Sequence, residues 1–217
     1  AEASGFAVTG QGKVSAVPDI AKFTFTVITE GDEDISTIYE DNNAKVERVK
    51  SFLSSMEIAE TDIQSTSYNL NPRYQYFNCN AGEVCPPPKI TGYSIHNGFS
   101  VKVRDMNQLN ETLSGVVQNG ANSVYDLQFT IDDPTELRNE ARKLAFEDAK
   151  KKARQLAESG DFALGRIMAV EEQAIGGVPT PMMRYDYGGV GGGGGGPSLE
   201  QGSQEIVVNV VLRYELR

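Results

Sequence analysis

Hydrophobic and polar residues alternate along several segments of the chain, and this period of two is typical of half-buried β-strands. In residues 21–30, Ala21, Phe23, Phe25 and Val27 alternate with polar side chains. Residues 62–77, 90–104, 123–132 and 205–216 show the same alternation, and residues 5–14 and 164–174 are also predicted to be strands. We therefore expect a chain rich in β-structure.

Other segments carry hydrophobic residues at the spacing of one helix face. In residues 34–56 this stripe consists of Ile35, Ile38, Val46, Val49, Leu53 and Met56. A second helix is predicted over residues 106–119, where Asp105 and Gln108 form a capping-box pair. A third has Asp133 as its N-cap and Pro134 at its first helical position, continues to about residue 159, and has alanine at every fourth position from Ala141. Such small side chains let a helix lie close against a sheet.

The predicted elements follow the order ββαββαβαββ, which is typical of an α+β fold with antiparallel sheets and helices packed on them. From residue 91 onward the order resembles a ferredoxin-like split. We expect one domain over residues 1–217, divisible into a ββαβ lobe over residues 5–90 and a βαβαββ lobe over residues 91–217.

A glycine-rich loop over residues 176–204 separates the last two predicted strands and contains six consecutive glycines, residues 191–196. A flexible coil of this length reaches roughly 30 Å on average, whereas a hairpin turn needs about 5 Å. The surplus length predicts an interaction role for the exposed Met182, Met183, Tyr185 and Tyr187. The alternative is that these side chains fold back over the protein's own sheet.

Cys79 and Cys85 are the only cysteines, and they lie in the predicted turn between the strands at 62–77 and 90–104. We expect them to form a disulfide, which implies an oxidising compartment; unpaired thiols and a redox-active pair are the alternatives. Neither a CxxC spacing nor a histidine cluster accompanies them, so zinc is not expected. Tyr74, Tyr76 and Phe77 lie beside this turn and are predicted to form an interaction surface.

The charge balance excludes several classes of protein. The chain has 20 Lys and Arg against 30 Asp and Glu, a net charge of −10. Nucleic-acid binding needs a basic surface, so we expect no nucleic-acid partner. No apolar run approaches the roughly 20 residues of a transmembrane helix. The start, Ala1-Glu2-Ala3-Ser4, resembles a mature end left after removal of a signal peptide, although a trimmed recombinant chain would look the same.

We expect no catalytic residues, no metal site and no cofactor. The lone histidine, His96, is predicted to face solvent from a strand, without a nucleophile and an acid brought to it. The acidic run at residues 32–34 suits the start of a helix. The glycine run lacks the ending of a phosphate-binding loop. Lys150, Lys151 and Lys152 are interpreted as the solvated face of the third helix.

Several short motifs, taken in order, resemble the SIMPL-domain family, in particular its bacterial YggE-like branch. They are residues 10–14 with Pro18-Asp19, residues 62–68 with Pro72 and Tyr74, Gly92-Tyr93 with Asn97 and residues 101–103, residues 120–122, Asp148-Ala149, and residues 210–216. The resemblance implies an exported, periplasmic or outer-membrane-associated protein that self-associates into ring-like or channel-like assemblies and is loosely linked to oxidative-stress defence. It supplies no catalytic residues, and neither the glycine-rich loop nor the cysteine turn maps to a family motif.

Three hypotheses follow. We favour a non-enzymatic exported protein that forms homo-oligomers through loop tips and sheet edges. The second hypothesis is a binding module whose aromatic loops hold a peptide, a partner protein or another component of the cell envelope. The third is an enzyme or redox protein.

Overall fold

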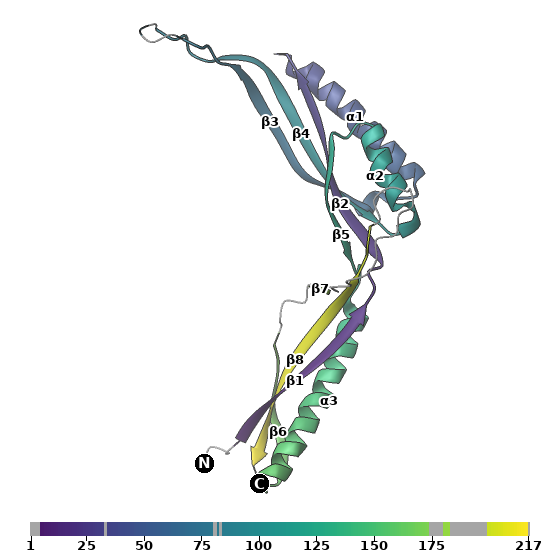
Figure 1. Ribbon diagram of the computed structural model, residues 1–217, viewed down its shortest axis with the longest axis vertical. Helices are drawn as coiled ribbons and strands as arrows, with labels where there is room; N and C mark the ends of the chain where they lie inside the picture. Colours follow the sequence, from purple (N-terminus) through teal and green to yellow (C-terminus); the bar gives the residue numbers. More distant parts are fainter. Residues whose placement is uncertain are drawn as a thin grey trace, which may run out of the picture. The chain divides into compact units, whose positions relative to one another are not determined.

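The structure is a computed structural model that describes residues 5–32, 34–79, 82, 84–173, 180–182 and 199–216. The fold is α+β, and the elements follow the predicted order with one additional short strand, β7 (Figure 1). The elements are β1(Gly5–Ala16), β2(Ile20–Gly31), α1(Ile35–Ser55), η1(Glu60–Asp62), β3(Ile63–Gln75), β4(Lys89–Val103), η2(Met106–Gln108), α2(Leu109–Gln118), β5(Ser123–Thr130), α3(Thr135–Ser159), β6(Leu164–Gln173), β7(Thr180–Met182) and β8(Ser203–Leu216).

The chain folds into two compact units. Unit 1 combines Ala1–Pro18 with Thr130–Arg217, and unit 2 is Asp19–Phe129. These two units do not coincide with the two lobes expected from the sequence, at residues 5–90 and 91–217, for two reasons. β1 pairs with β8 from the other end of the chain, and β3 pairs with β4 across residue 90. The elements after residue 90 therefore belong to both units and do not form one ferredoxin-like sheet.

Unit 1 is a sheet in the order β1-β8-β6, with β7 paired to the start of β8, and α3 packs on it (Figure 1). β1, β6 and β7 all pair antiparallel to β8. Alternate residues of β8 face α3, as the alternation predicted. The buried core consists of Val8, Ile131, Ala141, Ala145, Ala149, Ala153, Ile206, Val208, Val210, Leu212 and Tyr214.

The helix α3 lies unusually close to β1 because small residues face each other. The alanines predicted to form a stripe are buried against the sheet. Opposite them, β1 has Gly10 and Gly12. A Cβ at Gly10 would overlap the backbone carbonyl oxygen of Ala145, and a Cβ at Gly12 would overlap that of Ala141. The two glycines therefore set the distance between helix and sheet.

Unit 2 is a sheet in the order β3-β4-β2-β5, with α1 and α2 on one side (Figure 1). β4 pairs antiparallel with both β2 and β3. α1 packs over β2 and β4, and its buried Asn42 donates from Nδ2 to Thr29 Oγ1 at 3.2 Å. Phe25 and Phe99 stack in the core with ring centroids 5.1 Å apart.

α1 and α3 begin within one residue of the predicted starts, whereas residues 106–108 form the 3-10 helix η2 and α2 begins at Leu109. Asp34 accepts a hydrogen bond from the Ser36 amide, Asp105 from the Asn107 amide, and Asp133 from the Thr135 amide. The bonds to Thr37 and Ser36 hold the pKa of Asp34 below its ordinary value. These aspartates satisfy amides that a helix start leaves unpaired, so they are explained by capping.

Most of the glycine-rich loop, including Met183, Tyr185 and Tyr187, lies outside the described residues. Within it, the backbone of Thr180–Met182 forms β7 and pairs with residues 203–205 of β8. The interaction role of these side chains stays a prediction.

Candidate interaction surface

β3 is a long edge strand that α1 and α2 leave largely uncovered. It spans 13 residues, pairs with β4 alone among the described strands, and is exposed at almost every position. Figure 1 shows it on the side of the sheet away from α1 and α2. An edge strand of this kind leaves main-chain donors and acceptors free for pairing with another chain.

Aromatic side chains gather along β3 and beyond its end. The exposed fractions are 52% for Tyr68, 45% for Tyr74, 73% for Tyr76 and 40% for Phe77. Tyr68 stacks on Tyr39 of α1 with ring centroids 6.5 Å apart and planes nearly parallel. We call these five residues the aromatic hairpin surface. Partial burial, together with Tyr39, raises the pKa of Tyr68 above its ordinary value.

Local irregularities limit how regularly another strand could pair with β3. Its register against β4 shifts between Ser65 and Ser67 and again between Arg73 and Tyr74. Pro72 has no amide hydrogen to donate. Bulges and proline are common on edge strands, where they restrict uncontrolled pairing. β3 is therefore partly protected, and side-chain contacts would have to select the partner.

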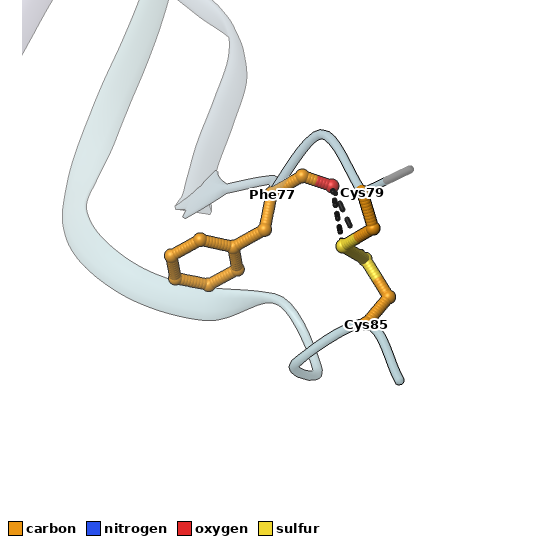
Figure 2. Close-up of a disulfide and its surroundings, with 3 residues drawn as sticks. All are labelled: Phe77, Cys79 and Cys85. Carbon is orange, nitrogen blue, oxygen red and sulfur yellow. Dashed lines mark hydrogen bonds between the residues drawn. A yellow bond between two sulfur atoms is a disulfide. The ribbon is translucent and has the colours of Figure 1, made fainter. Parts of the chain in front are cut away.

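The tip of the hairpin is closed by a disulfide between Cys79 and Cys85, with Cα atoms 5.6 Å apart. The Phe77 carbonyl oxygen lies 3.3 Å from Cys85 Sγ and 3.7 Å from Cys79 Sγ (Figure 2). Figure 2 also shows the Phe77 ring directed away from the disulfide. The bridge thus fixes the main chain next to one of the exposed aromatic residues.

Replacing both cysteines, as Cys79→Ser with Cys85→Ser, is expected to lower the free energy of unfolding by about 2 kcal/mol, because the closed loop is short. Urea unfolding of the oxidised wild type and the double variant measures this difference. The molecular mass in solution should stay unchanged. A fall in mass would instead make the cysteine turn part of an interface.

A hollow of about 410 Å³ lies between α1 and the start of β3. Phe99, Ile58 and Ile63 contribute apolar surface, and Glu47 and Lys50, which form an ion pair at 3.7 Å, line it from α1. The lining is mixed, with serines beside these groups. It indicates no particular ligand.

The other sequence candidates are placed as follows. His96 is half-buried in β4, opposite Ile28 and Asn69 in the ladder. Within the described ranges, no group of three or more His, Cys, Asp or Glu side chains could hold a metal ion. None of the helices in the described part of the chain is long and apolar enough to cross a membrane.

The structure adds Tyr39 to the residues that the sequence singled out. Its neighbour Ile38 is buried and belongs to the hydrophobic stripe of α1. The sequence signal was therefore an aromatic residue beside a buried helix face, but its stacking on Tyr68 depends on how α1 sits over the sheet.

The SIMPL family, described as a protein of unknown function (DUF541), matches residues 6–214. The chain belongs to the SIMPL family. The match runs through both units, and it confirms the resemblance drawn from the ordered motifs.

Curated SIMPL relatives are similar over most of the chain. The 26 kDa periplasmic immunogenic protein of Brucella melitensis is 30% identical over 181 residues, which cover 83% of this chain and 71% of the relative. The uncharacterized protein YggE of Escherichia coli (strain K12) is 28% identical over 176 residues, covering 81% of this chain and 68% of the relative. YggE of Edwardsiella ictaluri is 25% identical over 176 residues. None of these names states an enzymatic activity.

Proposed function

We propose that this SIMPL protein is a non-enzymatic component of the bacterial cell envelope that self-associates through the β3 edge and the aromatic hairpin surface. The observation that carries the proposal is the combination of a long uncovered edge strand with exposed tyrosines along it. Strand addition at an edge provides main-chain hydrogen bonds, and neighbouring side chains provide selectivity. Tyrosine is enriched at protein interfaces because it buries a large, rigid surface.

The proposed compartment is the periplasm. The tip disulfide suits an oxidising environment, and one relative carries the word periplasmic in its name. Association with the outer membrane and a link to oxidative-stress defence are further parts of the proposal, and they rest on the resemblance to the YggE-like branch.

The test is absolute mass by light scattering behind a sizing column. We expect the wild type to be larger than the 23.6 kDa chain and to dissociate on dilution. Tyr74→Ala with Tyr76→Ala should raise the dissociation constant of the assembly at least tenfold, which shifts the population toward the monomer. Tyr125→Ala is a matched control, because Tyr125 is also 45% exposed but lies on β5, at the other edge of the same sheet.

Two results would contradict self-association through this surface. One is a wild type that is monomeric at every concentration, and the other is a Tyr74 and Tyr76 variant with unchanged mass. A monomer would favour the second hypothesis, in which the same surface holds a peptide or an envelope partner. A chain lacking residues 183–196 tests the glycine-rich loop in the same measurement.

A further inference from the structure

The edge of β1 in unit 1 is occupied by side chains. β1 pairs with β8 alone among the described strands, so its other side is an edge. There the Gln11 amide donates to Asp148 Oδ2 at 2.9 Å, and Lys152 Nζ donates to the Thr9 carbonyl oxygen at 3.2 Å. Thr9 and Gln11 are two residues apart, so these groups point to the same side of the strand. They are the groups that an added strand would bond.

Asp148 and Lys152 act as one unit, which we call the α3 latch. They are one helical turn apart, and Lys152 Nζ also donates to Asp148 Oδ2 at 2.7 Å. The bonds from Lys152 and from the Gln11 amide hold the pKa of Asp148 below its ordinary value. The carboxylate therefore stays ionised through the neutral range. Lys152 thus has specific partners and is not simply part of a solvated lysine face.

The close packing of α3 on β1 brings the latch within reach of the strand. Side chains as short as aspartate can bond an edge amide only where the helix lies near the strand. Gly10 and Gly12 flank Gln11, and they permit this approach because they place no Cβ against the helix. The family-like motifs at residues 10–14 and 148–149 therefore meet in one structural arrangement.

An edge that is covered in this way contrasts with β3. Each unprotected edge strand is a site at which a further copy can add, so sheet proteins cover or interrupt their edges. We propose that the α3 latch closes the β1 edge against strand addition by a second copy of this chain. This inference rests on the proposed self-association through β3.

The test compares two double variants by light scattering. Asp148→Ala with Lys152→Ala removes the latch, while Glu147→Ala with Lys151→Ala removes an exposed acid and base at the same spacing on α3. Both variants keep the net charge of −10. The latch variant should at least double in mass relative to the wild type, and the control should not change. At a dilution at which the latch variant is dissociated, hydrogen exchange at its Gln11 amide should be at least tenfold faster than in the wild type.

A third substitution in the latch variant shows whether the added copies bind at the β1 edge. Adding Gln11→Pro to the latch variant removes the amide that a new strand would bond, so the extra mass should disappear. If Asp148→Ala with Lys152→Ala does not fold, Lys152→Ala alone frees the Thr9 carbonyl and is judged by the same criterion. A folded latch variant with wild-type mass overturns the inference. Failure of the β3 proposal is a separate result, because it shows as an unchanged mass in the Tyr74 and Tyr76 variant.

Discussion

Gly12→Ala is expected to lower the free energy of unfolding of unit 1 by about 3 kcal/mol, at the upper end of the usual cost of overpacking. The added methyl group would overlap the Ala141 carbonyl oxygen, and the Ala145 amide nitrogen would lie 2.6 Å from it. Both are helix backbone, so no flexible side chain can move aside. Relief requires α3 to move away from β1, which uncovers the alanine stripe.

Urea unfolding followed by far-UV circular dichroism measures this loss, since the chain has no tryptophan to report by fluorescence. Gln11→Ala is the matched control, because Gln11 is the neighbouring residue on β1 and its side chain is exposed. We expect the control to change stability by less than about 0.5 kcal/mol. Equal stabilities of the two variants would show that the glycines do not set the packing distance.

Phe99→Ala is expected to lower the free energy of unfolding of unit 2 by about 3–5 kcal/mol. The Phe99 ring is 4% exposed and stacks on Phe25 in the core. Truncation removes a buried aromatic surface and leaves a cavity beside the hollow between α1 and β3. Because Phe99 lies opposite Ser65 in the ladder, the loss should loosen the start of the exposed strand as well.

Hydrogen exchange resolved by segment measures this effect and assigns it to a unit. Protection should fall in β2, β3, β4 and α1. Phe77→Ala makes the same chemical change at a site that is 40% exposed, and it should cost less than about 0.5 kcal/mol. A similar cost at both positions would contradict the assignment of Phe99 to the core.

Part of the candidate surface could be predicted from the sequence. The alternation over residues 62–77, interrupted by Pro72 and followed by the cysteine turn, indicates a strand and tip rich in tyrosine. The structure places Tyr74, Tyr76 and Phe77 in exposed positions, and their role in association stays a prediction. Tyr39 was not predicted, because its position depends on how α1 packs over β2 and β4.

Local patterns were sufficient for the elements of secondary structure. A helix start needs an acceptor such as Asp34 or Asp133 within a few residues, and strand alternation is a property of neighbouring positions. The sequence alone therefore determined the order of the longer elements, the starts of α1 and α3 to within one residue, and the α+β class. The interpretation of Lys152 as solvated followed the same local logic, and it missed a partner 143 residues away.

Tertiary structure decided how distant segments meet. β1 pairs with β8, and the Gln11 amide donates to Asp148; both contacts join residues more than 100 positions apart. Such contacts also define unit 1, which combines the two ends of the chain. Neither alternation nor capping specifies which strands become neighbours, because pairing depends on the packing of whole faces. For the same reason, only the fold showed that the edge of β1 is covered by α3 while that of β3 is left exposed.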